Sequence, residues 1–512
     1  MRNSTVTNAT LLHPQDDVVI ALRDIEPGEI VRWPSSDSSE HEQSVAVAEP
    51  IPRGHKIIIH PVAAGEHVHK FGYSIGVAKE DITTGRWVHT HNLRTGLGEV
   101  LEYEYKPMVE SKPTAPALSV KPKTFQGYVR EDGEVGIRNE IWIINTVGCI
   151  NKTCETIAKL ANRQFEGKAI DGVHHFPHPY GCSQLGDDLT ATQKLLSALV
   201  RHGNAAGVLV IGLGCENNQI DSFKKAIGDY NPDRVKFLKS QEVEDELEEG
   251  VKLIGELVEY AERFKRQELP LSKLRIGLKC GGSDGFSGIT ANPLVGRIAD
   301  AITSAGGTAL LTEVPEMFGA ETILMDRAAD EQVFNGIVNL VNDFKAYFIR
   351  HGQEIYENPS PGNKDGGITT LEEKSLGCTQ KGGHATVTNV LQYGEPSRKP
   401  GLNLIQAPGN DLVSVTALSA AGAHIVLFTT GRGTPFGGPV PTVKIATNTQ
   451  LAERKKNWID FNAGQLIEGK TMDELRDDLL GQIVELASGD RQTNNERNGF
   501  REIAIFKDGV IL

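Results

Sequence analysis

Residues 207–219 read Gly-Val-Leu-Val-Ile-Gly-Leu-Gly-Cys-Glu-Asn-Asn-Gln. The aliphatic and β-branched first half has the composition of a strand that is buried on both faces, as in a parallel sheet. The run stops at Gly212 and Gly214 and then presents the thiol of Cys215 and the carboxylate of Glu216. Open α/β sheets bind ligands beyond the carboxyl ends of their strands. The stretch therefore predicts an α/β fold with a polar site at that edge.

The same pattern, a short apolar run that ends in Gly or Pro and then in polar residues, occurs five more times. These segments are Glu140–Cys149, Arg275–Asp284, Thr308–Glu316, Asn403–Asp411 and His424–Thr434. One such ending is ordinary turn chemistry. Six of them in one chain predict strands that converge on a single shared polar cleft.

The bulk properties limit the class of protein. A chain of 512 residues is too long for one core, so we expect two to four domains. The formal charge of −14 argues against a nucleic-acid partner, which would need a basic surface. No apolar run is long enough to span a membrane, and the first thirty residues contain no signal-peptide core. Together with six cysteines that fit free thiols, this predicts a cytoplasmic protein.

Composition divides the chain into four parts. Residues 11–105 repeat the pattern apolar-x-x-Gly-x-x-apolar four times, which predicts repeated tight turns in a small all-β domain. Residues 106–124 are rich in proline and lack periodicity, as an extended linker does. Residues 125–268 and 269–512 alternate strand-like and helix-like segments and are expected to be two α/β domains.

Histidines are concentrated in the first domain and include His55 and His91. A single surface histidine usually has no role in a site. The whole set, however, favours a wall of the active site or a lid over it, and the linker would let this domain move as a body.

Several polar segments of the last domain are candidates for the site. The glycine-rich loop 281–293 exposes backbone N–H groups and contains Ser283, Asp284 and Thr290, which suits an anion such as a carboxylate. Arg432 lies among glycines and is a candidate fork for a substrate carboxylate. Residues 356–378 are expected to be a long functional loop that supplies Asn363, Lys364, Lys374 and Cys378.

Six motifs together resemble the altronate/galactarate dehydratase family, and the resemblance extends over the chain from about residue 11. They lie at 128–139, 178–188, 212–218, 281–285, 358–364 and 495–498. The family implies a β-clip (SAF-type) amino-terminal domain, a second domain used in homodimer contact, and a Rossmann-like carboxyl-terminal domain on a parallel sheet. It also implies dependence on Fe²⁺, with Mn²⁺ as a related metal, and a role in hexuronate breakdown.

The resemblance implies a hydro-lyase that converts D-altronate to 2-dehydro-3-deoxy-D-gluconate. Removing the proton next to a carboxylate requires stabilisation of the enediolate, which a divalent cation supplies, and positioned acids and bases. We expect the metal at a set of thiols and carboxylates, with a Lys364 or Lys374 base and a His55 or His91 acid. The substrate carboxylate would bind Arg432 and the 281–290 loop. The leading metal ligands are Cys215, Glu216, Glu313 and Cys378.

Two alternatives remain open at the level of sequence. A sister enzyme, either a galactarate dehydratase or a lyase that removes sulfite from sulfolactate, would share the scaffold and the metal. A non-catalytic binding protein is the other alternative, because β-clip domains also serve as recognition modules. The dense polar strand ends of the larger domains argue against the second.

Overall fold

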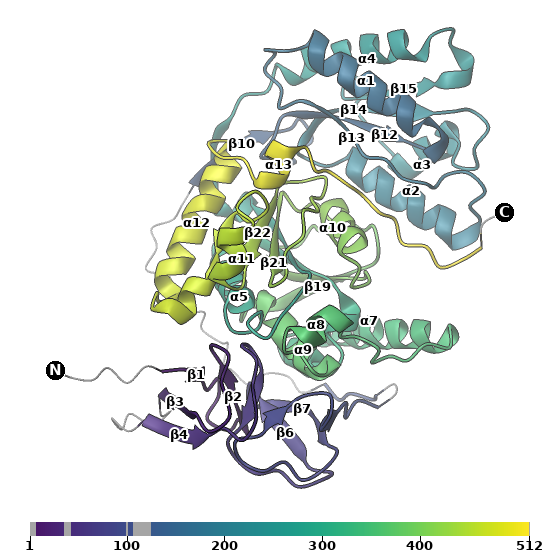
Figure 1. Cartoon of the computed structure of the whole chain (residues 1–512). Helices are drawn as coiled ribbons and strands as arrows, with labels where there is room; N and C mark the ends of the chain where they lie inside the picture. The colour runs from purple at the N-terminus through teal and green to yellow at the C-terminus, as the bar shows by residue number, and fades with distance from the viewer. Residues whose placement is uncertain (1–6, 35–41, 99–100, 106–123, 511–512) are drawn as a thin grey trace.

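The computed structural model describes residues 7–34, 42–98, 101–105 and 124–510. Figure 1 shows the amino-terminal β domain at one end, the carboxyl-terminal domain in the middle and the second domain at the other end. A multidomain α/β fold is confirmed. The predicted linker, apart from Thr124, lies outside the described residues. Within the described ranges, no helix has both the length and the apolar character needed to cross a membrane.

The amino-terminal domain is built from short antiparallel strands. They form three sheets with the orders β1-β2-β5-β8, β3-β4 and β6-β7-β9. The strands are β1 (Ala9–Thr10), β2 (Val18–Ala21), β3 (Ile30–Pro34), β4 (Glu42–Ala46), β5 (Lys56–Ile58), β6 (His67–Lys70), β7 (Tyr73–Ala78), β8 (Trp87–Val88) and β9 (Leu93–Arg94).

The repeated glycine pattern forms the turns that it predicts. Gly28, Gly54, Gly65 and Gly85 have φ angles of +84°, +83°, +85° and +86°, the left-handed region that favours glycine. The residues that begin the repeats pair as isolated bridges, Ile25 with Ile51 and Val62 with Ile82. The internal repeat therefore gives the domain its turns and part of its strand pairing.

The second domain contains a four-stranded parallel sheet with the order β13-β12-β14-β15. Its strands are β12 (Glu140–Asn145), β13 (Val173–His175), β14 (Ala205–Gly212) and β15 (Val235–Lys239). All eight residues of β14 are buried, which confirms the strand predicted from residues 207–212. The helices are α1 (Asn151–Gln164), α2 (Gly186–Val200), α3 (Ile220–Ile227) and α4 (Glu246–Ala261), with 3-10 turns η1 (Gly148–Ile150) and η2 (Ser240–Glu242).

A small antiparallel sheet joins the second domain to the third. Its order is β11-β10-β16, from β10 (Thr124–Val129), β11 (Val135–Gly136) and β16 (Gln267–Pro270). The turn between β10 and β11 contains Gly133 at φ +83°, where Asp132-Gly133 predicts a hairpin. Because β16 is paired with β10, the chain enters and leaves the second domain at one place.

The carboxyl-terminal domain is organised by a seven-stranded, all-parallel sheet with the order β19-β20-β18-β17-β21-β22-β23. The strands are β17 (Arg275–Cys280), β18 (Thr308–Leu311), β19 (Val387–Leu391), β20 (Gly401–Ile405), β21 (Ile425–Thr430), β22 (Thr442–Ala446) and β23 (Phe461–Asn462). β18, β19 and β20 lie on one side of β17, whereas β21, β22 and β23 lie on its other side. The strand order therefore reverses between β17 and β21, which is the topological switch point of the sheet.

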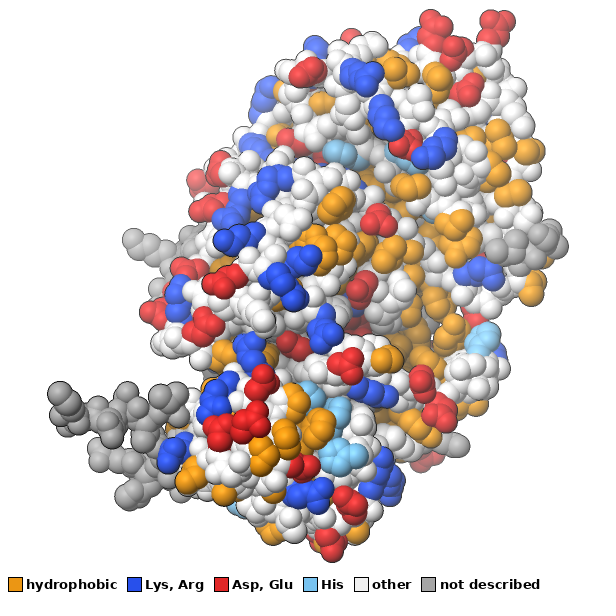
Figure 2. Space-filling model, viewed as in Figure 1, with side chains coloured by type: hydrophobic (Ala, Val, Ile, Leu, Met, Phe, Trp, Pro, Cys, Tyr) orange, Lys and Arg blue, Asp and Glu red, His pale blue; other side chains and the backbone are white. Residues whose placement is uncertain are grey.

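Helices surround this sheet, and the main apolar core lies between the helices and the strands. They are α5 (Ala291–Ser304), α6 (Glu321–Met325), α7 (Glu331–Arg350), α8 (Pro361–Asp365), α9 (Leu371–Thr379), α10 (Asp411–Ala420), α11 (Thr449–Arg454), α12 (Met472–Ser488) and α13 (Asn494–Asn498). The 3-10 turns are η3 (Leu271–Lys273), η4 (Val314–Glu316), η5 (Gln380–Gly382) and η6 (Ala463–Glu468). Figure 2 shows acidic and basic side chains interspersed over the face in view.

Two predictions about this architecture were wrong. The six strand ends do not share one cleft, because β12 and β14 belong to the sheet of the second domain and only β17, β18, β20 and β21 end together. Residues 356–378 are not one long loop, because they contain α8 and most of α9. Ser360 and Pro361 begin α8 with a capping box, and Thr370 caps α9, so local capping outweighs the glycine and proline content.

Candidate functional site

Two thiols and one carboxylate meet at the carboxyl edge of the seven-stranded sheet. Cys280 ends β17, Glu316 ends the turn after β18, and Cys378 lies in α9. The two Sγ atoms are 3.2 Å apart, and the Glu316 Oε2 atom is 3.4 Å from Sγ of Cys280 and 3.1 Å from Sγ of Cys378. One ligand atom from each residue lies within 4.8 Å of the others, and all three residues are buried. We call this group the thiol–carboxylate cluster.

The turn after β18 brings its acids to the cluster. Glu313 has φ +68°, a conformation that non-glycine residues adopt rarely and at some cost. Pro315 lies in the first turn of η4 and fixes its own φ. Backbone strain of this kind is frequent where a side chain must be aimed at a site. Here the Glu313 carboxylate accepts a hydrogen bond from the Cys280 backbone N–H at 3.2 Å.

Three buried lysines surround the cluster. Lys279 pairs with Glu313, and with Asp411 at 3.0 Å. Lys381 Nζ lies 2.7 Å from the Glu313 carboxylate and 2.8 Å from Sγ of Cys280. Lys374 pairs with Glu316 at 2.9 Å. The three ammonium groups are thus matched by three carboxylates, those of Glu313, Asp411 and Glu316.

The pKa values follow from this arrangement. Burial opposes ionisation of Glu316, but the ammonium groups of Lys374, Lys279 and Lys381 prevail and hold the pKa of Glu316 below its usual range. The hydrogen bond with Cys280, followed by burial, raises the pKa of the Cys378 thiol. Although burial opposes it, the Glu316 carboxylate raises the pKa of Lys374. The carboxylate is therefore ionised and the Cys378 thiol is protonated at neutral pH.

Cys280 and Glu316 of the cluster line a cavity of about 530 Å³. This volume lies within the usual range of small-molecule sites. The polar lining comprises Cys280, Glu316, Asn358, Asn363, Lys374 and Asp411, and the apolar wall comprises Phe344, Tyr347, Phe348 and Phe506. A cavity lined by both charged and aromatic side chains suits a small polar substrate.

The donor set fits a divalent transition metal. Two cysteines and one carboxylate lie close together, and two of the three, Cys280 and Glu316, line the cavity. They form a mixed soft and hard donor set of the kind that suits Fe²⁺ better than Mg²⁺. Cys280, Glu316 and Cys378 would hold the ion.

Four residues that the sequence predicts for the site lie in or beside the cluster. Cys378 is a member, and Glu313 is bound to two of its lysines. Lys374 lines the cavity and donates to Asn358 at 3.0 Å and to Asn363 at 3.2 Å. Asn363 also donates to the backbone carbonyl of Ser283 at 2.8 Å. Their roles remain predictions.

The glycine-rich loop lies next to the cluster, but protein groups already bind the side chains of Asp284 and Thr290. Asp284 accepts hydrogen bonds from Thr447 at 3.0 Å, and burial raises the pKa of Asp284. The Thr290 hydroxyl donates to the Thr447 carbonyl at 2.8 Å. Ser283 and Asp284 line a small cavity of about 10 Å³ that Lys374 and Cys378 also line, and a cavity of that size holds one water molecule at most.

Lys364 and Arg432 are not at the cavity. Lys364 is half-buried in α8, and its ammonium has no hydrogen bond or ion pair with any residue that the structure describes. Arg432 is exposed, and its backbone N–H donates to the Gly282 carbonyl at 2.9 Å. The described part of the cavity lining includes neither residue.

Cys215 and Glu216 follow β14, in the sheet of the second domain, and not the strands that end at the cluster. The Glu216 carboxylate accepts hydrogen bonds from the Thr146 hydroxyl at 2.6 Å and from the backbone N–H groups of Leu213 and Gly214 at 3.0 and 2.6 Å. Cys215 is exposed and lies 3.6 Å from the Gln241 amide. Glu216 thus holds its own loop together.

The amino-terminal histidines lie where that domain contacts the third. Trp87 Nε1 donates to His55 Nδ1 at 3.1 Å, and His55 Nε2 faces the Asp365 carbonyl at 3.4 Å. Burial, followed by the charge of Lys56, lowers the pKa of His55 to about 4, so it is neutral at neutral pH. His91 is exposed, with its ring centroid 5.2 Å from that of Trp87.

Sequence reasoning did not select Lys279, Cys280, Glu316 or Lys381. Cys280 is followed by two glycines and Glu316 ends the segment Glu313-Val-Pro-Glu, so both were recognisable as polar groups at strand ends. Lys279 is a charge inside an otherwise apolar strand, and a buried lysine needs a partner. That charge was the available signal for a buried ionic site.

Comparison with known proteins identifies the family. Family models match residues 7–96 (altronate/galactarate dehydratase SAF domain), 127–262 (D-galactarate dehydratase/altronate hydrolase, second domain) and 271–511 (D-galactarate/altronate dehydratase, C-terminal).

Full-length relatives agree with these matches. The altronate dehydratase of Bacillus subtilis is 53% identical over 98% of this chain and 99% of its own length. The altronate dehydratase of Escherichia coli is 52% identical over 98% and 99% of the two chains. The galactarate dehydratase (L-threo-forming) of Escherichia coli is 32% identical over 98% and 97%. The chain therefore belongs to the D-galactarate/altronate dehydratase family.

Proposed function

We propose that this protein is an altronate dehydratase, a hydro-lyase that converts D-altronate to 2-dehydro-3-deoxy-D-gluconate in hexuronate catabolism. The convergence of two thiols and a carboxylate beside a cavity of about 530 Å³, which Cys280 and Glu316 line, carries the proposal. The relatives named for altronate share 52–53% identity with this chain, against 32% for the relative named for galactarate, and this favours altronate.

We propose Fe²⁺, with Mn²⁺ as an alternative, as the metal held by Cys280, Glu316 and Cys378. When bound, such an ion supplies positive charge that stabilises negative charge on a neighbouring carboxylate and enediolate. The donor chemistry supports this assignment, since thiolates favour iron over magnesium.

The residues of the chain itself supply binding and proton transfer. Lys374 holds a proton at Nζ, 2.9 Å from Glu316, and lines the cavity where a sugar-acid hydroxyl would lie. Because it is protonated, it is placed to give up a proton to a departing hydroxyl and not to act as the base that the sequence predicts. Positioned proton transfer contributes about 10²–10⁴ in rate. Asn358 and Asn363 orient the ammonium and offer hydrogen bonds to substrate hydroxyl groups.

Two measurements test the proposal separately. The iron-loaded protein, kept anaerobic, is incubated with altronate, galactarate or sulfolactate, and the 2-keto-3-deoxy acid or released sulfite is measured. We expect turnover with altronate above that with the other two substrates. Preferred turnover of galactarate or sulfolactate would assign the sister activity instead. No turnover with any of them would favour a binding protein.

Metal binding is measured with Co²⁺, whose thiolate-to-metal absorption does not depend on turnover. We expect the band in the wild type and its loss in Cys280→Ser and Cys378→Ser. Glu316→Gln should weaken Co²⁺ binding, whereas Glu216→Gln, at the end of the other sheet, should leave it unchanged. An unchanged band in both cysteine variants would refute the assignment.

We also propose a cytoplasmic homodimer in contact through the second domain. The six cysteines are free, as in a reducing compartment. Leu160, Leu185 and Tyr230 of the second domain are exposed apolar side chains that a partner subunit could cover. Light scattering should give twice the chain mass, and Leu160→Glu should reduce it to one chain if α1 is in the interface.

A further inference from the structure

Three exposed cysteines lie at one edge of the second domain, away from the thiol–carboxylate cluster. Cys149 follows β12, Cys182 follows β13 and Cys215 follows β14, and β12 lies between the other two strands in the parallel sheet. Because the carboxyl ends of parallel strands meet at one edge of a sheet, the three thiols share that edge. Free cysteine is among the most buried residue types, so packing does not explain three exposed thiols at one edge. We call these cysteines the thiol triad.

Hydrogen bonds tie the three cysteine-bearing loops to one another. The Gly148 backbone N–H donates to the Tyr180 carbonyl at 2.8 Å and joins the first loop to the second. The Gly181 carbonyl accepts a hydrogen bond from the Asn218 backbone N–H at 3.0 Å, which joins the second loop to the third. The Asn218 side-chain amide donates to the Thr146 carbonyl at 3.1 Å and joins the third loop to the first. The three loops are therefore held together as one unit.

A glycine precedes each cysteine of the triad and lets the loops approach closely. A Cβ on Gly148 would lie 2.6 Å from the His178 carbonyl oxygen, and a Cβ on Gly181 would lie 1.9 Å from the Thr146 carbonyl oxygen. Gly214 has a φ angle of +132°, in the region that favours glycine. A side chain at these positions would push the loops apart, so the glycines keep the three thiols near one another.

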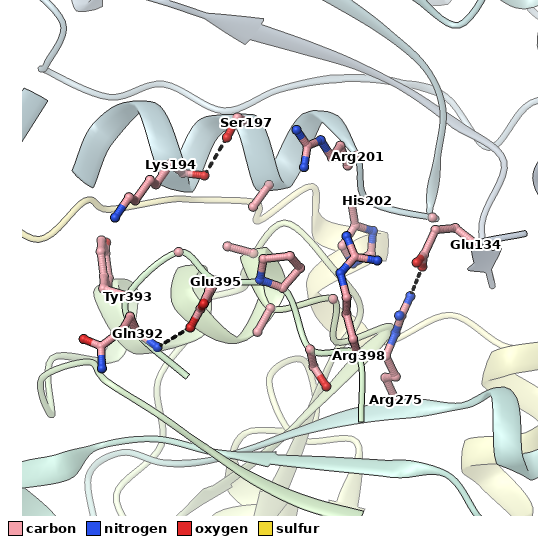
Figure 3. A pocket seen from close by; sticks show the side chains of 18 of the residues that line it. Glu134, Lys194, Ser197, Arg201, His202, Arg275, Gln392, Tyr393, Glu395 and Arg398 are labelled. Atoms are coloured by element: carbon pink, nitrogen blue, oxygen red, sulfur yellow. Dashed lines mark hydrogen bonds and ion pairs between the residues drawn. The ribbon is translucent and has the colours of Figure 1, made fainter. Parts of the chain in front are cut away.

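The triad lies where three helices begin. α1 begins at Asn151, α2 at Gly186 and α3 at Ile220, each within five residues of a triad cysteine. The amino end of a helix carries partial positive charge and favours negatively charged groups, such as thiolate ligands and the cluster that they hold. The other half of α2 contributes Lys194 and Ser197 to a cavity of about 610 Å³ between the second and third domains (Figure 3). The triad is therefore separate from that cavity.

A buried amide beside the triad lacks a hydrogen-bond partner. Gln184 is 1% exposed, and its Oε1 atom accepts a hydrogen bond from the Gly181 backbone N–H at 3.1 Å. Its Nε2 atom has no partner among the residues that the structure describes. An unsatisfied buried donor costs free energy, and a bound ion or ligand is one reason for such a group to be present. A sulfide ion bound at the triad would be an acceptor for this amide.

The spacing of the three thiols distinguishes between a single metal ion and a metal cluster. Among the residues that the structure describes, the thiol–carboxylate cluster is the one set of three whose ligand atoms all lie within 4.8 Å of one another. The three Sγ atoms of the triad are therefore more widely spaced. A metal–sulfur bond is about 2.3 Å long, so thiolates on one tetrahedral ion lie about 3.8 Å apart. In an iron–sulfur cluster each thiolate binds a different iron, and the thiolates lie farther apart.

We propose that Cys149, Cys182 and Cys215 bind a 4Fe–4S cluster at this edge of the second domain. Each thiol loses its proton to solvent and binds one iron as a thiolate. Two ferrous, two ferric and four sulfide ions make up the core, so its assembly from these ions needs no further oxidant or reductant. Three thiolates leave the fourth iron for water or a small oxygen ligand. This site is additional to the single ion proposed for the thiol–carboxylate cluster and does not depend on it.

Anaerobic reconstitution of the full-length protein tests the site. The protein is incubated with ferrous and ferric iron, sulfide and dithiothreitol, then desalted and assayed for iron and acid-labile sulfide. We expect about four sulfides per chain, and the EPR signal of a reduced cluster after dithionite is added. The sulfide content reports the iron–sulfur cluster alone, because a single metal ion brings no sulfide. A wild-type protein that retains no sulfide would overturn the proposal.

Variants locate the iron–sulfur cluster. Replacing all three triad cysteines, by Cys149→Ser, Cys182→Ser and Cys215→Ser, should remove the sulfide. Far-UV circular dichroism should show unchanged folding, because the three side chains are exposed. The matched controls are Cys154→Ala, a buried thiol of the same domain, and Cys378→Ser, and both should retain the sulfide. Sulfide that persists in the triple variant, or equal loss in Cys378→Ser, would place the iron–sulfur cluster elsewhere and refute the site.

Co²⁺ separates an iron–sulfur cluster from a single-ion site at the triad. In Cys280→Ser/Cys378→Ser, Co²⁺ added without sulfide should give no thiolate-to-metal absorption, because the triad is too widely spaced for one ion. Absorption that appears in this variant, and disappears when the triad is also replaced, would show a single-ion site and overturn the assignment of an iron–sulfur cluster.

Discussion

Glu373 is shared by two lysines of the amino-terminal domain, and its replacement by glutamine should loosen that domain. Its carboxylate lies 2.8 Å from Lys56 Nζ and 2.8 Å from Lys70 Nζ, with side-chain exposures of 2%, 0% and 3% for Glu373, Lys56 and Lys70. Glu373 lies in α9, next to the cysteine-bearing turn of that helix. The three charges thus fasten the β domain to the helix that contributes to the candidate site.

The expected loss is about 3 kcal/mol. Removing one partner from a buried ion pair costs about 3–5 kcal/mol, because a charge remains without a partner. The pKa of Glu373 gives a second measure: burial opposes ionisation, but Lys56 and Lys70 prevail and hold it at about 2, against an ordinary 4.5. That difference corresponds to about 3 kcal/mol. Burial also lowers the pKa of Lys56 to about 8, so Lys56 can become neutral in the variant, which favours the lower figure.

Hydrogen exchange at β5 and β6 measures the effect. About 3 kcal/mol corresponds to a decrease of roughly 100-fold in amide protection. The control is Glu155→Gln: Glu155 also joins two lysines, Lys152 at 2.7 Å and Lys159 at 2.6 Å, but on the exposed surface of α1. Exposed ion pairs contribute little to stability, so we expect Glu155→Gln to leave the amide protection of α1 unchanged. A decrease of less than tenfold in Glu373→Gln, or equal effects in the two variants, would refute the reasoning.

The ionisation of Glu373 also predicts a pH dependence, because its stabilising effect is complete above pH 4.5 and is lost as the pH falls toward about 2. Amide protection of β5 and β6 in the wild type should therefore decrease across that interval. In Glu373→Gln the same protection should change much less with pH. Gly28→Ala and Gly85→Ala form a matched pair, with φ of +84° and +86°. Backbone strain alone should destabilise Gly28→Ala by about 1 kcal/mol. In Gly85→Ala the new Cβ would also lie 2.2 Å from the Ala46 carbonyl oxygen, so the urea midpoint of Gly85→Ala should be lower than that of Gly28→Ala. Equal urea midpoints in the two variants would contradict this prediction. Because burial lowers the pKa of His55 to about 4, its NMR signals should not titrate between pH 5 and 8, and a midpoint near 6.5 would show that the contact with Trp87 opens in solution.

Local features were predictable because they depend on neighbouring residues. Glycines at a fixed place in the repeat adopt positive φ because other residues avoid that region. The segment 207–212 forms a buried strand because its side chains are apolar on both faces. The separation into a β domain and two α/β domains follows from the same short-range patterns. The six sequence motifs, by their resemblance to a known family, further indicated the family and its reaction.

The composition of the candidate site depended on contacts between distant residues. Sequence patterns identify strand ends, but they do not identify which strands share a sheet, so Glu216 and Glu313 looked equivalent although they follow strands of different sheets. Cys280, Glu316 and Cys378 come from three separate elements, up to 98 positions apart, and only packing brings their ligand atoms together. The sequence by itself therefore determined the strands, turns and domains, because these follow from local backbone preference and the burial of apolar side chains. Tertiary structure alone decided which charges and thiols are neighbours, because the free energy of burying them is recovered only when all their partners arrive in the folded chain.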